Sequence, residues 1–131
     1  MIRKDPFKID IQDNLYFLVF HKSIDCGFGP SVSLYINGYE FLKFDCFGRN
    51  KGHFHIYGKK SEIIFFTENT SLEQINKTSY ELTNNIKFYL QKSNIKYIQK
   101  FTIQTDVFVV KLNDAINKML EYENNFYSLL R

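Results

Sequence analysis

The hydrophobic pattern of the chain changes its period near residue 67, and this change limits the folds that the chain can adopt. Before that point, short apolar runs and alternating segments are separated by turn signals, a pattern typical of β-strands. After that point, apolar residues recur at intervals of three and four, which predicts helices. We therefore expect an α+β fold, in which an antiparallel sheet of about four to six strands comes first and two long helices follow.

Five segments of the first half are expected to form strands: residues 15–20, 31–36, 39–47, 53–57 and 62–67. The Asn37-Gly38 pair marks a hairpin between two of them. A two-residue turn would pair Val32 with Lys43 and would place that lysine on the apolar face. A three-residue turn with a bulge at Gly38 pairs Val32 with Leu42 and keeps the lysine outward, so we expect this second register.

This register divides the side chains of the hairpin and of the next strand between two faces. The apolar face, which the helices should cover, carries Val32, Leu34, Leu42, Phe44, Cys46, Phe54 and Ile56. The other face carries Ser31, Ser33, Lys43, Asp45, His53, His55 and Tyr57. We therefore expect Cys46 to be a core residue, whereas the second face should be exposed or should contact a partner.

Two overlapping capping boxes, Thr70 to Glu73 and Ser71 to Gln74, predict the start of a helix over residues 71–92. A second helix is expected over residues 112–130. Between them, residues 95–104 favour a strand, and residues 107–110 fit either a strand or a helix. Because no linker or repeat interrupts the chain, residues 1–131 are expected to form a single domain.

The composition excludes several classes of protein. Of the 131 residues, 44% are hydrophobic, which is enough for a core that needs no disulfide scaffold. The formal charge of +3 is smaller than that of a dedicated duplex-DNA binder. No run approaches the ~20 apolar residues of a membrane span, and no secretory signal is visible. We expect a cytoplasmic protein without a membrane partner.

The stretch from Asp45 to His55 carries the densest set of chemically active side chains. His53 and His55 lie two residues apart on one expected strand, so their side chains should point the same way, about 6.6 Å apart. Asp45 belongs to the neighbouring strand and to the same face. This set could perform acid–base catalysis on a phosphodiester, or it could bind a divalent metal, the only cofactor that the pattern suggests. Two histidines on an exposed strand are also common as ordinary polar surface.

Three further residues are candidates for contact with a substrate. Arg49 and Lys51 lie in the loop between the two strands and could hold a phosphate. Tyr57 continues the row of histidines along its strand. No glycine-rich phosphate loop is present, because the segment 27–30 ends in proline and precedes a strand rather than a helix.

Residues 30–90 resemble a class of small bacterial domains. The shared pattern is an aromatic-Asp pair that ends a strand, a glycine-containing loop, and Gly-His-x-His on the next strand, here residues 52–55. The TumE-like toxins of toxin–antitoxin systems have this pattern. The matching polar positions are Asp45, His53 and His55. The resemblance implies a component of a bacterial or phage conflict system, with a cognate antitoxin as its partner.

Two kinds of function are consistent with these features. The first is a nuclease-like or metal-dependent hydrolase that acts on RNA or another phosphate ester through Asp45, His53 and His55. The second is a non-catalytic immunity, inhibitor or phage anti-defence protein, which would bind a toxin or a defence protein. Its anchors would be the outward aromatic residues Tyr35, Phe41 and Tyr57. A homodimer that pairs through the exposed sheet face is a third arrangement, and the sequence does not decide between catalysis and binding.

Overall fold

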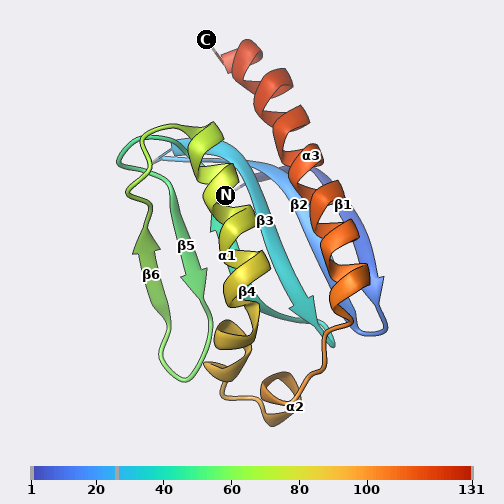
Figure 1. The fold of residues 1–131 in the computed structure, drawn as a ribbon. Coiled ribbons are helices and arrows are strands. Elements are labelled where there is room, and N and C mark those ends of the chain that lie inside the picture. The colour runs from blue at the N-terminus through green and yellow to red at the C-terminus, as the bar shows by residue number, and fades with distance from the viewer. Residues whose placement is uncertain (1, 26, 131) are drawn as a thin grey trace.

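The computed structural model describes residues 2–25 and 27–130, and its N-terminal half forms a six-stranded antiparallel sheet (Figure 1). The strands are β1 (Ile2–Gln12), β2 (Leu15–Ile24), β3 (Gly27–Ile36), β4 (Tyr39–Asp45), β5 (His53–Ile56) and β6 (Glu62–Phe65). Each strand pairs with the strand that follows it in the chain, so β1 and β6 form the two edges of the sheet. The expected α+β fold is confirmed.

Three helices follow the sheet: α1 (Ser71–Gln91), α2 (Lys96–Gln99) and α3 (Thr105–Leu130). The first begins where the capping box predicts, because the backbone N–H of Glu73 donates to Thr70 Oγ1 at 3.1 Å. The long helices α1 and α3 cover the same face of the sheet, and α2 lies in the connection between them (Figure 1). Among the described residues, no helix combines the length and the apolar character that crossing a membrane requires.

The structure differs from the expectations for the segment between the long helices. The strand expected over residues 95–104 is wrong, because this segment contains α2 and an irregular connection. The last helix begins at Thr105, before the expected residue 112. Phe108 is buried and lies with its ring centroid 5.5 Å from that of Phe17 in β2. This packing outweighs the strand preference of the valines near the start of α3.

The hairpin between β3 and β4 has a tighter turn than expected. Asn37 and Gly38 have φ angles of 52° and 81°, which are the positive values of a two-residue type I′ turn. Ile36 and Tyr39 pair directly on either side of it. The turn therefore carries no bulge, and the register of the hairpin must be set elsewhere.

The extra residue lies inside β4. A register shift next to Leu34 leaves Phe41 as the bulge residue, and Val32 pairs with Phe44 rather than with Leu42. The expected pairing is thus wrong by two residues, a shift that keeps each side chain on its expected face. Phe41 is the exception, because it is buried in the core and is not an outward anchor.

β3 begins earlier than expected, at Gly27 instead of after a loop. Within this extension, Gly29 pairs with Lys22 of β2. A Cβ atom at Gly29 would lie 2.3 Å from the backbone oxygen of Cys46, so a larger residue cannot occupy this position without displacing the backbone. The close approach brings β3 against the end of β4, where the chemically active stretch begins.

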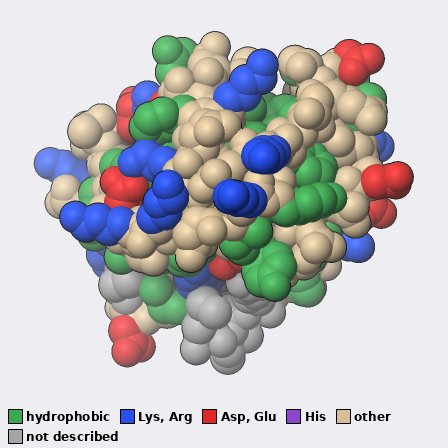
Figure 2. Space-filling model, turned by 90° about the horizontal axis from the view of Figure 1, so that it is seen from below, with side chains coloured by type: hydrophobic (Ala, Val, Ile, Leu, Met, Phe, Trp, Pro, Cys, Tyr) green, Lys and Arg blue, Asp and Glu red, His purple; other side chains and the backbone are tan. Residues whose placement is uncertain are grey.

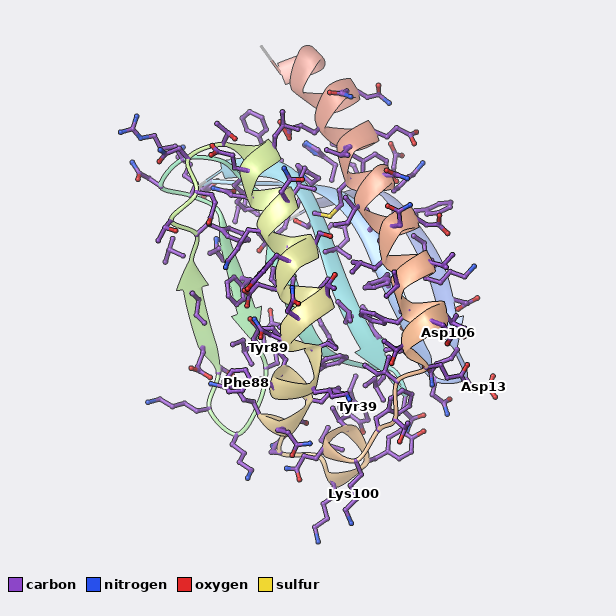
Figure 3. The ribbon with its side chains drawn as sticks, viewed as in Figure 1. Asp13, Tyr39, Phe88, Tyr89, Lys100 and Asp106 are labelled. Carbon is purple, nitrogen blue, oxygen red and sulfur yellow. The ribbon has the colours of Figure 1, made fainter. Side chains whose placement is uncertain are left out.

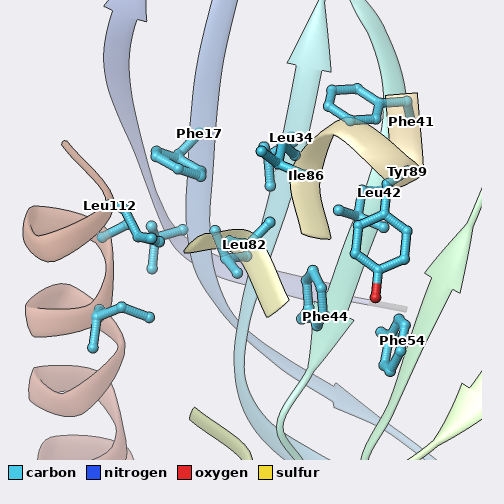
Figure 4. Packing of buried hydrophobic residues seen from close by; sticks show 14 of the residues in the cluster. Phe17, Leu34, Phe41, Leu42, Phe44, Phe54, Leu82, Ile86, Tyr89 and Leu112 are labelled. Carbon is cyan, nitrogen blue, oxygen red and sulfur yellow. The ribbon is translucent and has the colours of Figure 1, made fainter. Parts of the chain in front are cut away.

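The hydrophobic core fills the space between the sheet and the helices α1 and α3 (Figure 4). The rings of Phe44 and Phe54 stack with centroids 4.8 Å apart, and Tyr89 of α1 lies 6.2 Å from Phe54. Cys46 is fully buried, with its Sγ atom 3.4 Å from Thr78 Oγ1, and burial raises the pKa of its thiol. The prediction that Cys46 belongs to the core is confirmed.

Candidate active site

The pairing of β3, β4 and β5 gathers the predicted polar residues on the sheet face opposite the helices. Asp45 pairs with Ser31 on one side and with His53 on the other. His55 follows two residues later on β5 and therefore points the same way. One ligating atom each of Asp45, His53 and His55 lies within 4.8 Å of the other two. The structure thus brings the three residues together, and their chemical roles stay predictions.

The carboxylate of Asp45 is fully buried and is surrounded by four side chains. Ser31 Oγ donates to Oδ1 at 2.6 Å. Three nitrogen atoms lie around Oδ2: Lys22 Nζ at 3.4 Å, His53 Nε2 at 3.2 Å and His55 Nε2 at 3.5 Å. Burial by itself would raise the pKa of this carboxyl group, but the surrounding donors hold the pKa far below its usual range. Asp45 is therefore ionised at neutral pH.

Both ring nitrogens of His53 are engaged. Nδ1 lies 2.8 Å from the backbone carbonyl oxygen of Lys51, and the ring must donate in this bond because a carbonyl has no proton. Nε2 faces Asp45, and this contact raises the pKa of His53 against the opposing effect of burial. With protons on both nitrogens, His53 is an imidazolium that links the loop to the carboxylate.

His55 has a different environment from His53. Its Nε2 atom faces Asp45, and its ring stacks on Tyr57 with centroids 5.4 Å apart and planes 10° apart. The side chain of His55 is 17% exposed, whereas that of Asp45 is 0% exposed. Within the described part of the chain, no hydrogen bond engages its Nδ1 atom. Of the two histidines, His55 is therefore the one whose ring is partly exposed and keeps a nitrogen without a hydrogen bond among the described residues.

The expectation that this face is exposed is wrong around Asp45. Ser31 and Ser33 have short side chains, and longer side chains lie beside them on this face. The buried residues of the face are Lys22, Ser31, Ser33, Lys43, Asp45 and His53. The rings of Phe47 and Phe65 lie 5.7 and 5.5 Å from the ring of His53. Figure 2 shows one end of the molecule, where lysine and arginine side chains lie among hydrophobic ones and no histidine of the described residues is visible.

Lys22 is the member of the cluster that the sequence did not reveal. It lies on β2 beyond the strand expected there, and its side chain is only 5% exposed. Burial lowers the pKa of Lys22, while the charge of Asp45 acts in the opposite direction. The alternation along β2 assigns Lys22 to the outer face, but only the register between β2 and β3 places it beside Asp45.

The three predicted substrate contacts have separate positions. Arg49 is exposed and lines a cavity of about 340 Å³ that is also lined by Ser71 and Glu123, so it lies beside the ends of the long helices, and no contact between Arg49 and the histidines is present among the described residues. Lys51 contributes its backbone carbonyl to His53 rather than a charge to the cluster. Tyr57 alone adjoins the predicted catalytic residues, through its stacking on His55.

Two of the three ligand separations in the cluster suit a divalent metal, whereas the charge of the cluster does not. Adjacent ligands of a tetrahedral zinc ion with bonds of 2.0–2.1 Å are about 3.4 Å apart. The distances of 3.2 and 3.5 Å from Asp45 Oδ2 to the two Nε2 atoms are close to this value. The bond from His53 Nδ1 to a backbone carbonyl is also common for metal ligands. Lys22 opposes a metal, because its ammonium already neutralises the same oxygen.

Comparisons with known proteins add no family to this description. No protein-family model matches the sequence. No curated protein matches it either. The fold has no match among solved structures. The likeness to TumE-like toxins therefore stays an expectation, and any function for this chain rests on the geometry around Asp45 and His55.

Proposed function

We propose that the protein cleaves phosphodiester bonds of single-stranded RNA, with His55 as the general base. One observation carries the proposal: Asp45 holds Nε2 of His55, while Nδ1 of the same partly exposed ring is free of hydrogen bonds among the described residues. A buried carboxylate that binds one imidazole nitrogen fixes the tautomer and leaves the lone pair of the other nitrogen available to accept a proton. Asp45 and His53 are positioning residues in this arrangement.

The reaction requires one proton acceptor close to a ribose. His55 Nδ1 takes the proton of the 2′-hydroxyl group, and the 2′ oxygen then forms a bond to the adjacent phosphorus atom. The bond from phosphorus to the 5′ oxygen breaks, and that oxygen takes a proton back from the imidazolium or from water. The products are a 2′,3′-cyclic phosphate and a 5′-hydroxyl end. No additional reactant is needed.

The neighbours of His55 suit an RNA strand. Lys43 pairs with His55 across β4 and β5 and places a positive charge beside it, where a phosphate would gain charge during the reaction. On the other side, β6 presents Ile63 and Phe65, which are 58% and 60% exposed. An exposed aromatic ring beside a basic group is the usual platform for stacking a nucleobase.

The resemblance to TumE-like toxins suggests a biological setting for such an activity. A small nuclease of this kind would act as the toxin of a bacterial conflict system, and a cognate antitoxin would cover the His55 face. Expression in bacterial cells should then arrest growth, and His55→Gln should relieve the arrest. Growth that continues normally during wild-type expression would contradict this setting, although it would leave the cleavage reaction to the biochemical test.

The biochemical test is cleavage of a single-stranded RNA oligonucleotide labelled at both ends, with EDTA present. The wild type should produce cyclic-phosphate ends, and His55→Gln should lower the rate by about 100-fold or more, the usual contribution of a general base. Glu81→Gln is the matched control, since it changes a buried carboxylate on α1, on the helix side of the sheet, whereas the histidines lie on the opposite face. A wild type that leaves RNA intact with EDTA overturns the proposal.

A divalent metal is the second candidate for this site, because His53 already has the backbone bond that orients metal ligands. A metal bound by Asp45, His53 and His55 would supply a Lewis acid and a bound water of lowered pKa. Titration of the metal-free protein with Zn²⁺, followed by calorimetry, distinguishes the two occupants. Tight binding that His53→Gln and His55→Gln both abolish would replace the proton-based proposal, and absence of binding supports it.

A non-catalytic protein-binding role is favoured by a different observation, the exposed apolar residues of β6. An immunity or inhibitor protein would form a tight complex with its partner whether or not His55 is present. If the purified chain leaves RNA intact and His55→Gln still protects cells against a toxin encoded beside it, the binding role replaces the catalytic one.

A further inference from the structure

The edge strand β6 is unusually apolar for a free edge. It comprises only Glu62–Phe65, and within the described ranges it pairs with β5 alone. Ile63, Ile64 and Phe65 are 58%, 39% and 60% exposed. Edge strands of monomeric proteins are usually protected by charges, prolines or bulges, because an apolar edge readily pairs with another strand.

The hydrogen bonds to β5 show which backbone groups of β6 point away from the sheet. Phe66 N–H donates to the oxygen of Gly52 at 3.0 Å, and Ile64 is paired with Phe54. Residues of an antiparallel strand alternate between the two neighbouring sides. The backbone groups of Phe66 and Ile64 thus point toward β5, and those of Ile63 and Phe65 point toward the free edge.

This alternation of backbone groups between β5 and the free edge restricts how two copies of β6 can pair with each other. Residues that point outward must pair with residues that point outward, so the twofold axis of an antiparallel pair passes through Ile63, Ile64 or Phe65. An axis at Phe65 would place Glu62 opposite Glu68 of the second copy, where like charges repel. An axis at Ile63 would place Lys60 opposite an apolar residue, Phe66.

An axis at Ile64 is the one of the three that brings opposite charges together, in the residues that flank β6, while Glu62 lies opposite Phe66. Ile63 then lies opposite Phe65 of the second copy, and Lys60 lies opposite Glu68. Because the axis repeats each contact, the pair contains two such ion pairs at its ends. Figure 3 shows Phe88 on the side of α1 that faces the β5–β6 hairpin, and this residue is 58% exposed, so it adds apolar surface on the helix side of the same edge.

We propose that this edge binds a second copy of the chain, with β6 paired antiparallel about a twofold axis at Ile64. The two sheets then join into one sheet of twelve strands. The strands β5 of the two copies are separated by three strand spacings, which places the two histidine clusters on the same face, about 14 Å apart. The pairing does not depend on RNA cleavage, since it uses the backbone of β6 and not His55.

Oligomeric state and register are tested separately. Sedimentation equilibrium over a range of concentrations should show a monomer–dimer equilibrium. Lys60→Glu and Glu68→Lys should each weaken the dimer by about tenfold, because each change replaces two attractive pairs with two repulsive ones. The double variant Lys60→Glu/Glu68→Lys should restore wild-type affinity. A monomer at every concentration overturns the proposal, and so does a dimer that both single changes leave unaltered.

The position of the axis is tested by cross-linking in a Cys26→Ser background. Directly opposed residues of a non-hydrogen-bonded pair have Cα atoms about 4.5 Å apart, which is within the range of a disulfide. Ile64→Cys should therefore form a covalent dimer under mild oxidation, whereas Ile63→Cys should not. Both residues are exposed in the single chain, so each is a control for the folding of the other. Cross-linking through Ile63→Cys alone would overturn the proposed axis.

Discussion

Asp45 and Glu81 are two buried carboxylates with similar numbers of partners but different kinds of partner. Glu81 lies on α1 and accepts hydrogen bonds from Tyr89 Oη and, at 3.1 Å, from Asn85 Nδ2, while Lys77 Nζ lies 3.1 Å from its other oxygen. These contacts lower the pKa of Glu81 against the opposing effect of burial, as the contacts of Asp45 do. Each carboxylate is therefore charged at neutral pH.

The two clusters differ in what their partners can do. Contact with Glu81 and burial both raise the pKa of Tyr89, so the phenol stays protonated at neutral pH (Figure 3 shows its place on α1). Asp45 instead faces the imidazole rings of His53 and His55, and imidazole is the side chain most often used for proton transfer in catalysis. The partners of Glu81 therefore suit a role in stabilising a helix and its packing, whereas Asp45 lies among the side chains for which we propose acid–base catalysis.

The largest effect is expected when each carboxylate is replaced by its amide. Asp45→Asn leaves Lys22 and His53 without a counter-charge in a buried site, and we expect the free energy of unfolding to fall by about 3–5 kcal/mol. Glu81→Gln should cost only about 1 kcal/mol, because Lys77 is partly exposed and the amide oxygen can still accept a hydrogen bond. Urea unfolding at pH 7 measures both. Equal losses would mean that the two clusters have the same structural role.

A smaller effect is expected from removing one hydroxyl donor from each carboxylate. Ser31→Ala deletes the bond to Asp45 Oδ1 and should cost about 2 kcal/mol, since hydrogen bonds to charged groups are among the stronger ones. Tyr89→Phe deletes the corresponding bond to the charged carboxylate of Glu81 and should also cost about 2 kcal/mol. RNA cleavage distinguishes the two variants, because only Ser31→Ala should slow it. A slow Tyr89→Phe variant would contradict the division between the clusters.

Much of the fold could be predicted because local signals agree with tertiary packing. The start of α1 is set by Thr70, whose capping bond with Glu73 is predicted by the sequence and present in the structure, whereas Ser71 donates to the backbone oxygen of Cys46 instead. β1 is missing from the five expected strands, although its residues Phe7, Ile9 and Ile11 alternate as in a strand. Around α2 the local signal and the tertiary packing disagree. The apolar alternation of these residues is typical of a strand, but the segment packs against α1 and forms a short helix.

The candidate site could be predicted only in part. Alternation along β4 and β5 is enough to place Asp45, His53 and His55 on one face. Their burial depends on the size of the neighbouring side chains, and the presence of Lys22 depends on how β2 pairs with β3. Register across three strands is a tertiary property, set here by a bulge at Phe41 that no turn signal indicates.

The smallest effect is expected in the pH dependence of stability, and it concerns His53. Folding raises the pKa of His53, so the stabilisation is complete below its unfolded pKa of about 6.5 and disappears as the pH rises through its folded pKa. The stability difference between wild type and His53→Gln should therefore shrink between pH 6 and pH 9, by about 1.4 kcal/mol for each unit by which the folded pKa exceeds the unfolded one.

Glu81→Gln provides the control for this pH series. Folding lowers the pKa of Glu81, so its stabilisation is present above its unfolded pKa of about 4.3 and is lost only as the pH falls below that value. Its difference from wild type should be constant between pH 6 and pH 9. A His53→Gln difference that is equally constant would mean that His53 is neutral in the folded protein. Its Nε2 lone pair would then face Asp45 Oδ2, an arrangement that needs a cation between them, and the metal-binding alternative would become the better account of the site.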